Sequence, residues 1–206
     1  MIQILKRYLR SGRGGTAAEF ALVLPVLLFF MFGIIDAGRL MWTWNKAEKA
    51  TQMGARFAVV TGPVPSGLVN YDFVGVGGLT QGDVVPAGAY GTMTCQKPTT
   101  TVTCACTTGS CPWGTGATAA SFTNVYDRMR RFLPELATNN LMIDYSPSGL
   151  GYAGNPNGAD IAPLVTVRLR NMTFMPIMMR IFGSTIALPD FRASLTLEDA
   201  AGTKSN

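Results

Sequence analysis

The chain has 206 residues, of which 48% are hydrophobic and only 14% are charged, a more apolar composition than that of an ordinary soluble domain. It contains no histidine, no glycine-rich phosphate loop and no zincin motif, so we expect no enzymatic activity, no cofactor and no metal site. The net charge of +5 comes largely from the first 14 residues, and without their four cations about +1 remains, too little for a nucleic-acid-binding surface.

A basic leader, residues 1–14, precedes a long apolar segment. The leader contains four cations and no acid; the cations are Lys6, Arg7, Arg10 and Arg13. No charged residue occurs from Phe20 to Ile35, and the apolar character continues to Trp42, so we predict a transmembrane segment from Phe20 to Trp42. The positive-inside rule then predicts a cytoplasmic N-terminus and an extracytoplasmic remainder.

One acidic residue, Glu19, stands at the start of this apolar segment, shortly after the pair Gly14 and Gly15. A carboxylate near the hydrocarbon costs on the order of 2 to 3 kcal/mol, so we expect it to have a cationic partner. A secretory signal peptide would have a shorter apolar region followed by small residues, whereas here the small residues come first. Cleavage at the glycines would therefore remove only the leader and leave the hydrophobic helix on the mature protein, as in prepilins.

A family resemblance is carried by residues 13–25, Arg-Gly-Gly-Thr-Ala-Ala-Glu-Phe-Ala-Leu-Val-Leu-Pro, and by residues 50–58, Ala-Thr-Gln-Met-Gly-Ala-Arg-Phe-Ala. These stretches resemble the TadE-like pilus-assembly proteins, which are minor pseudopilins of the tight-adherence (Flp) type IV pilus machinery. The resemblance covers residues 13 to about 60. A weaker similarity occurs near the C-terminus, in Leu-Val-Thr-Val-Arg-Leu and Phe-Arg-Ala-Ser-Leu-Thr-Leu-Glu.

The resemblance implies cleavage by a prepilin peptidase after a glycine, with a glutamate at the fifth mature position and an aromatic residue after it. Counting back from Glu19 and Phe20 puts the cut between Gly14 and Gly15, and cleavage after Gly15 is the alternative register. The cut creates an α-amino group with a reference pKa of about 8, which can serve as the cation for Glu19 of a neighbouring subunit. The other interpretation is an interfacial glutamate stabilised by the positive end of its own helix.

Beyond the transmembrane segment the helical pattern continues until Thr61-Gly62-Pro63, which predicts one helix from about Thr16 to Val60, on the order of 65 Å long. Within it, Pro25 is expected to kink the axis. Asp36 and Arg39, three residues apart near the outer interface, are interpreted as a local ion pair. The outer part carries a stripe of small and apolar residues that needs a globular partner. The stripe consists of Ala47, Ala50, Met53, Gly54, Phe57 and Ala58.

All four cysteines fall in a region rich in glycine, threonine and proline, residues 62–118, for which we predict irregular β-structure or long loops. They are Cys95, Cys104, Cys106 and Cys111. In an oxidising compartment they are expected to form two disulfides within the loop 95–111. Two pairings are sterically reasonable, Cys95–Cys104 with Cys106–Cys111, or Cys95–Cys106 with Cys104–Cys111, and a hairpin turn at Lys97–Thr100 favours the first. A zinc site of four thiolates is a weaker alternative, because the paired Cys-x-x-Cys spacing is missing.

The C-terminal half has the pattern of an α+β domain. An apolar stripe from Phe122 to Leu136 predicts an amphipathic helix that Pro134 kinks or ends. Three short runs, residues 141–145, 164–170 and 185–198, suit strands, and alternation in the last two predicts an antiparallel sheet with one buried face. We therefore predict a pilin-like transmembrane helix, residues 15–61, followed by a periplasmic head, residues 62–206, in which the amphipathic helix packs on the sheet.

Two further motifs have competing interpretations. The stretch Gly154–Asp160 has oxygen ligands at alternating positions, but its Asn-Pro and Asn-Gly pairs favour turns over a calcium loop. An apolar patch surrounds Pro176 and is interpreted as core filling in preference to a docking surface. Its methionines are Met172, Met175, Met178 and Met179.

Together these patterns predict a minor pseudopilin that is inserted once in the bacterial inner membrane with its head in the periplasm. Its expected partners are the inner membrane, a prepilin peptidase, other pilin-like subunits and the pilus assembly platform, and no nucleic acid. The alternative is an uncleaved, membrane-tethered periplasmic binding or adhesion module. An envelope hydrolase is a third class that no motif supports. Whether the subunit primes, caps or enters the filament, or serves a secretion system, is left open.

Overall fold

A computed structural model of the chain describes residues 15–198 and residue 200. The chain divides into two compact units. The helix unit contains Met1–Thr43 and Phe174–Ile186, and the head unit contains Trp44–Thr173 and Ala187–Asn206.

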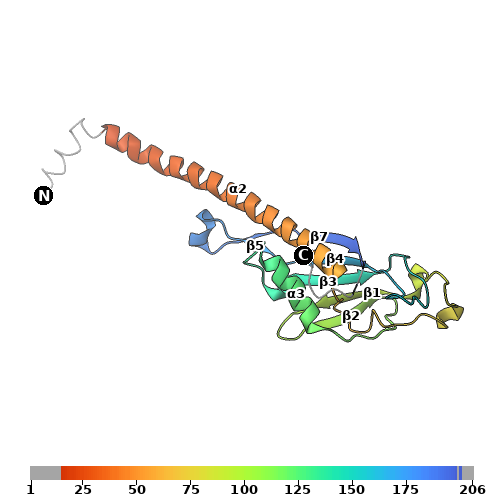
Figure 1. Cartoon of the computed structure of the whole chain (residues 1–206). Coiled ribbons are helices and arrows are strands. Elements are labelled where there is room, and N and C mark those ends of the chain that lie inside the picture. The colour runs from red at the N-terminus through yellow and green to blue at the C-terminus, as the bar shows by residue number, and fades with distance from the viewer. Residues whose placement is uncertain (1–14, 199, 201–206) are drawn as a thin grey trace. The chain divides into compact units, whose positions relative to one another are not determined.

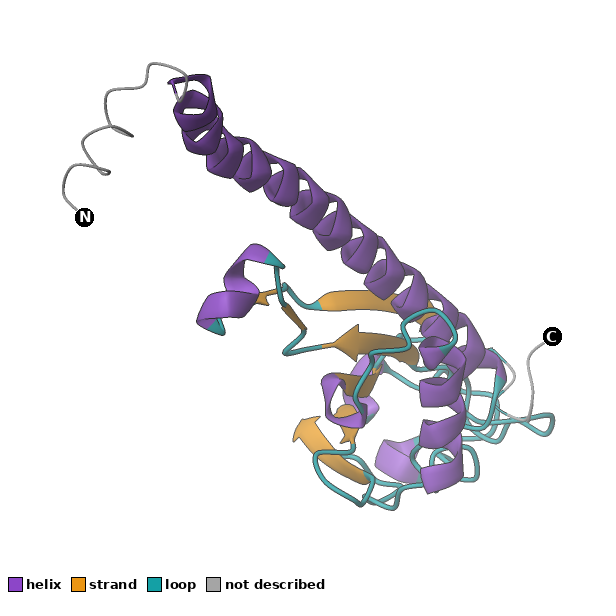
Figure 2. Ribbon diagram, turned by 90° about the vertical axis from the view of Figure 1, so that its left-hand side faces the viewer, coloured by secondary structure: helices purple, strands orange, loops and turns teal. Residues whose placement is uncertain are grey.

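The first element, α2, is a single α-helix of 46 residues, Gly15–Val60 (Figure 2). The prediction of one helix from about Thr16 to Val60 is confirmed, and the helix continues through Pro25. Alanine, leucine and methionine, which favour helices, are common along it. At the end, the Thr61 hydroxyl donates to the carbonyl of Phe57 at 2.8 Å and satisfies one of the last free acceptors, just before Pro63 prevents continuation.

The head unit contains a five-stranded antiparallel sheet with the strand order β2-β1-β3-β4-β7 (Figure 1). The strands are β1 (Thr92–Gln96), β2 (Thr103–Thr108), β3 (Leu141–Ser146), β4 (Leu164–Leu169) and β7 (Phe191–Thr196). The predicted antiparallel sheet and the α+β class are confirmed. The region 62–118 is more regular than predicted, because it supplies β1 and β2.

The remaining elements are short apart from one helix. The helix is α3 (Ala119–Arg130), and a two-stranded sheet pairs β5 (Thr173–Phe174) with β6 (Ile186–Ala187). Short 3-10 turns are η2 (Val76–Gly78), η3 (Ala87–Ala89), η4 (Thr138–Asn140) and η5 (Met178–Phe182). The helix α3 is shorter than the predicted stripe. It ends before Pro134, and Leu133 and Leu136 reach the core from the turns that follow it.

The core of the head unit lies on one face of the sheet, which buries the alternate residues of β4 and Leu141, Ile143 and Tyr145 of β3. Asp144 of β3, on the opposite face, is also buried. Helix α3 adds Phe122, Val125 and Met129, and the outer part of α2 adds its predicted stripe of small residues. Gly54 marks the closest approach of these layers: an added Cβ would lie 2.7 Å from Met129 Sδ and 3.3 Å from Val167 Cγ1. The glycine in the stripe therefore allows α2, α3 and β4 to meet.

The contact at Gly54 gives a stability prediction. We expect Gly54→Leu to lower the free energy of unfolding of the head by about 2 to 3 kcal/mol, because the new side chain overlaps Met129 and Val167. The measurement is urea unfolding of the full chain in detergent, monitored by tryptophan fluorescence. The matched control is Gly38→Leu, in the same helix, where an added Cβ would meet nothing within 4 Å. Equal midpoints for the two variants would contradict the packing described here.

The prediction of one continuous strand over residues 185–198 is wrong. This stretch is divided into β6 and β7, and Pro189, which has no N–H to donate to a neighbouring strand, lies between them. Its alternation is also incomplete, because Leu195 is 41% exposed although it lies opposite the buried Val165. Strand β7 is at the edge of the sheet, so its residues are covered less fully than those of β4.

Candidate functional site

The predicted processing site lies at the start of α2. Gly14 and the leader cations fall outside the described residues, and Gly15 is the first residue of the helix. Glu19 and Phe20 follow in the first two turns and are both exposed. Within residues 15–198 no hydrogen bond or ion pair reaches the Glu19 carboxylate. The carboxylate is thus open to a partner from outside the described part of the chain.

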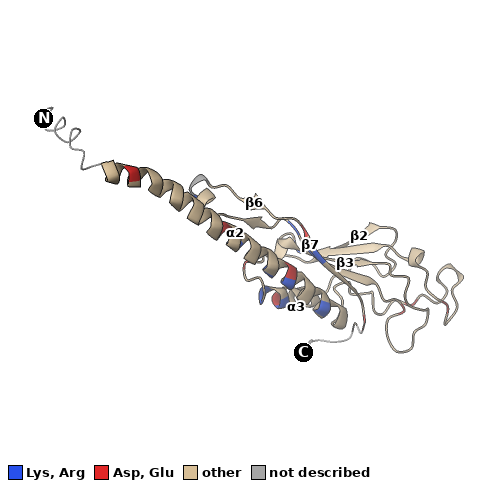
Figure 3. Cartoon of the chain, turned by 90° about the horizontal axis from the view of Figure 1, so that it is seen from above, with Lys and Arg blue, Asp and Glu red and all other residues tan. Residues whose placement is uncertain are grey.

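The N-terminal half of α2 exposes apolar side chains over most of its surface, whereas Leu28 and Phe32, which line the groove beside the 174–186 segment, are half-buried. Its exposed large side chains are Phe20, Leu22, Val23, Val26, Leu27, Phe29, Phe30, Met31, Ile34, Ile35, Met41 and Trp42. Charged residues are sparse along this half of the helix (Figure 3). Leaving such a side chain in water instead of burying it costs about 1.5 to 3 kcal/mol. Within the described residues, α2 is the one helix that is long and apolar enough to cross a membrane. This half of α2 is therefore suited by length and composition to cross a membrane.

Asp36 has more partners than the sequence predicts. The expected pair with Arg39 is present, with 3.0 Å between Arg39 Nη1 and Asp36 Oδ1. In addition, the backbone N–H of Ile177 donates to Oδ1 at 2.8 Å and that of Met178 donates to Oδ2 at 3.1 Å. The residue is only 8% exposed. Asp36 therefore caps the first turn of η5 and attaches the 174–186 segment to α2.

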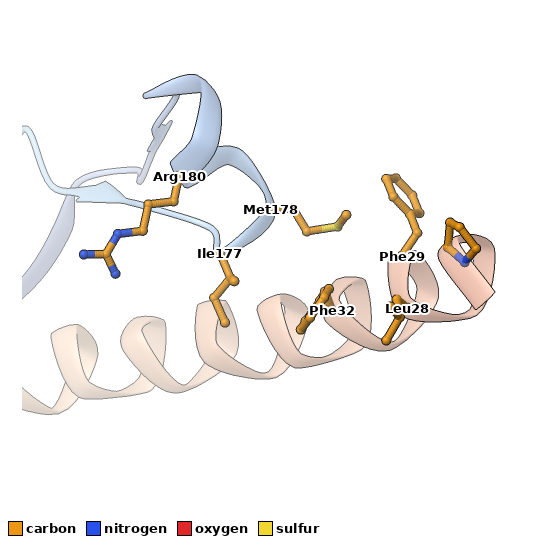
Figure 4. Close-up of a pocket in the computed structure, with 7 residues that line it drawn as sticks. Leu28, Phe29, Phe32, Ile177, Met178 and Arg180 are labelled. Atoms are coloured by element: carbon orange, nitrogen blue, oxygen red, sulfur yellow. The ribbon is translucent and has the colours of Figure 1, made fainter. Parts of the chain in front are cut away.

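An apolar groove of about 760 Å³ lies between α2 and the 174–186 segment (Figure 4). It is lined by Pro25, Leu28, Phe29, Phe32, Ile177, Met178 and Arg180. In Figure 4 the Met178 side chain extends toward Phe29, whereas the Arg180 guanidinium points the opposite way along the helix. The groove thus has an apolar end near Phe29 and a cationic end at the Arg180 guanidinium.

The methionine patch divides between two environments. Met172 and Phe174 are buried, as core filling requires. The prediction is wrong for Met175 and Met179, which are 44% and 43% exposed, and Ile177 beside them is 40% exposed. These three residues belong to the segment that Asp36 holds against α2, and Ile177 also lines the groove beside that helix.

The four cysteines form two pairs in the structure. Cys95 lies directly opposite Cys104 in the β1–β2 ladder, with 1.95 Å between the sulfurs, and the Cys106 and Cys111 sulfurs are 2.03 Å apart. This is the first of the two pairings that the sequence leaves open. The bridges close the hairpin and the segment that follows it, which is a structural role in the head unit.

The stretch Gly154–Asp160 forms a turn whose centre is the Asp160 carboxylate. The carboxylate accepts hydrogen bonds from the backbone N–H groups of Phe73, Gly154 and Asn155 at 2.8 to 2.9 Å. Burial raises the pKa of Asp160, but these three hydrogen bonds outweigh it, so that the pKa lies below its ordinary value. Because the oxygens point at N–H donors, the arrangement favours the turn interpretation over a calcium loop.

The environment of Asp160 gives a second stability prediction. We expect Asp160→Ala to cost about 2 kcal/mol or more, since one buried and two half-buried N–H groups lose a charged acceptor. Because the folded pKa is lowered, the contribution is present above the unfolded pKa of about 4 and is lost as the pH falls through the folded pKa. Wild-type stability, measured by urea unfolding in detergent, should therefore fall from pH 5 to pH 3 by more than that of the variant.

The control for this prediction is Asp127→Ala, which removes an exposed carboxylate from α3. We expect the control to unfold like the wild type. Parallel pH profiles for the wild type and Asp160→Ala would contradict the stabilising role of the ionised carboxylate.

Comparison with known proteins locates one similarity in the chain. Residues 14–56 match the family model described as TadE-like protein. No curated protein and no solved structure matches the chain significantly. The match begins at the glycine pair, includes Glu19 and Asp36, and ends before the last turn of α2, so that the five-stranded sheet and the 174–186 segment lie outside it. Most of α2 is thus similar to the TadE-like family, as the sequence predicts.

Proposed function

We propose that this protein is a minor pseudopilin of a tight-adherence type IV pilus, anchored in the inner membrane and acting in assembly or initiation of the filament. The observation that carries the proposal is the anatomy of the TadE-like segment. A glycine pair is followed by an exposed carboxylate at Glu19 and then by a helix that is apolar on all sides. The role is structural and not enzymatic, and the head is in the periplasm.

The first step of the proposed mechanism is cleavage by a prepilin peptidase between Gly14 and Gly15. Cleavage removes the basic leader, which otherwise holds the N-terminus at the cytoplasmic surface. It also leaves an α-amino group on Gly15 at the beginning of α2. Glu19 of a neighbouring subunit accepts this cation as a partner, and the pairing fixes the axial offset between the two helices.

The second step is helix packing. Gly33 and Gly38 leave the surface of α2 open, since an added Cβ at either position would meet nothing within 4 Å. Small residues on a membrane helix allow another helix to approach closely, and Ala37 lies four residues after Gly33. The exposed apolar side chains of α2 are then transferred from lipid to the contacts between subunits, with little change in the free energy of their burial.

A genetic experiment tests this function. In the native host, we expect deletion of the gene to abolish filaments recovered by shearing, and the wild-type gene to restore them. Gly14→Val should insert in the membrane but fail to restore filaments, because a bulky side chain at the cut blocks cleavage. The control is Gly12→Val, the same change inside the leader. Normal filaments in the deletion strain would refute the proposal.

A further inference from the structure

We propose that the 174–186 segment is a second membrane-embedded element, inserted in the outer leaflet beside α2 and held there by Asp36. Its partner is the phospholipid bilayer. The inference rests on the proposed membrane anchoring of α2, and it adds a contact with lipid that the TadE-like segment does not contain, since the family match ends at residue 56.

Asp36 lies at the outer end of the apolar run of α2. It follows directly after the uncharged run from Phe20 to Ile35, where a carboxylate needs hydrogen-bond donors from protein because water is scarce. Arg39 supplies one donor, and Ile177 and Met178 supply two backbone N–H groups. The 174–186 segment therefore lies at the depth at which the apolar run ends.

The 174–186 segment is apolar in composition and has exposed apolar side chains. Among its 13 residues, Phe-Met-Pro-Ile-Met-Met-Arg-Ile-Phe-Gly-Ser-Thr-Ile, Arg180 is the single charged one. Met175, Ile177 and Met179 are each at least 40% exposed. In water these three side chains would form an apolar surface on a short turn with no core of its own. Contact with acyl chains removes that cost, and flexible methionine side chains adapt well to a fluid surface.

Two side chains of the segment point in opposite directions at the groove. Met178 extends toward Phe29, which is deeper in the uncharged run of α2, and Arg180 points the other way along the helix (Figure 4). This is the orientation of an interfacial element, in which the apolar side chain enters the hydrocarbon and the guanidinium reaches toward the headgroups. Arg180, together with the half-exposed Arg39, then faces the phosphates of phospholipids. The acyl chains fill the apolar part of the groove.

Spin labelling measures the depth of this segment directly. The four native cysteines are paired in disulfides, so a new cysteine is the single free thiol of the full-length protein. Nitroxide labels are attached to Met179→Cys and, as a second site, to Met175→Cys, and the protein is reconstituted in phosphatidylethanolamine and phosphatidylglycerol vesicles. Collision rates with oxygen, which enters the hydrocarbon, and with a nickel chelate, which stays in water, then report the depth.

Two reference sites make the result decisive. Val23→Cys reports the membrane helix, and Thr100→Cys reports an exposed turn of the head unit. We expect the labels at Met179 and Met175 to collide with the nickel chelate about tenfold less often than the label at Thr100, as at Val23, because a polar complex is excluded from hydrocarbon. If the labels at Met179 and Met175 collide with the nickel chelate as often as the label at Thr100, while the label at Val23 is protected from it, the inference is overturned. The membrane anchoring of α2 is then still supported. If Val23 is itself open to nickel, the anchoring and the inference both fail.

Discussion

Replacing Glu19 with alanine is expected to abolish filament assembly while membrane insertion and peptidase cleavage continue. The change removes the only carboxylate between the glycine pair and Asp36, and with it the proposed partner of the new α-amino group. An unpaired ammonium near hydrocarbon costs on the order of 2 to 3 kcal/mol, which corresponds to a loss of about 30- to 150-fold in the association of two subunits. The measurement compares filaments recovered by shearing, protein in the membrane fraction and the mass of the mature chain.

The control for this experiment is Glu48→Ala. It removes an exposed carboxylate from the same helix, within the head unit, where the carboxylate accepts a hydrogen bond from Trp44 Nε1. We expect this variant to form filaments normally. Normal assembly by Glu19→Ala would exclude the pairing between subunits and leave the interaction of Glu19 with its own helix as the remaining interpretation.

The second large effect is expected for Asp36→Ala. Without the carboxylate, the N–H groups of Ile177 and Met178 and the Arg39 guanidinium lose their acceptor. Hydrogen bonds to a charged group contribute about 1.5 to 3 kcal/mol each, so the equilibrium for release of the 174–186 segment should shift by at least about tenfold. With both proteins in nanodiscs, we expect trypsin to cleave Asp36→Ala after Arg180 at least about tenfold faster than the wild type. The fragments are identified by mass.

Asp190→Ala provides the matched control. Asp190 also pairs with an arginine, Arg170, at 3.2 Å, and it lies close to the segment in the sequence, but it makes no contact with residues 177 and 178 among the described hydrogen bonds and ion pairs. Its loss should leave cleavage after Arg180 at the wild-type rate. If Asp36→Ala and Asp190→Ala were cleaved equally fast, the carboxylate would not be what holds the segment.

The elements that are predicted well are those fixed by local patterns. The end of helix α2 at Val60 is predicted correctly, because the helical pattern stops at Thr61-Gly62-Pro63. The stripe on α3 and the alternation in β4 likewise predict the buried faces that the structure contains. Each of these patterns is formed by residues that lie close together in the sequence, within one helix or one strand.

The elements that the sequence does not predict depend on distant contacts. Ile177 is 141 residues from Asp36, and no local pattern shows that its N–H caps a carboxylate on α2. The sequences of strands β1 and β2 consist largely of threonine and cysteine and have no clear apolar alternation. Cys95 and Cys104 are buried because they lie opposite each other in the β1–β2 ladder. The exposure of Met175 depends on what the segment packs against, which composition alone cannot distinguish from core filling.

The mass of the intact mature protein, purified from its native host, shows whether the leader is removed. We expect a chain that begins at Gly15, or at Thr16 in the alternative register, with both disulfides retained. A chain that still begins at Met1 in cells with an active prepilin peptidase would contradict the proposed pairing, because Glu19 would then have no new terminal amine with which to pair.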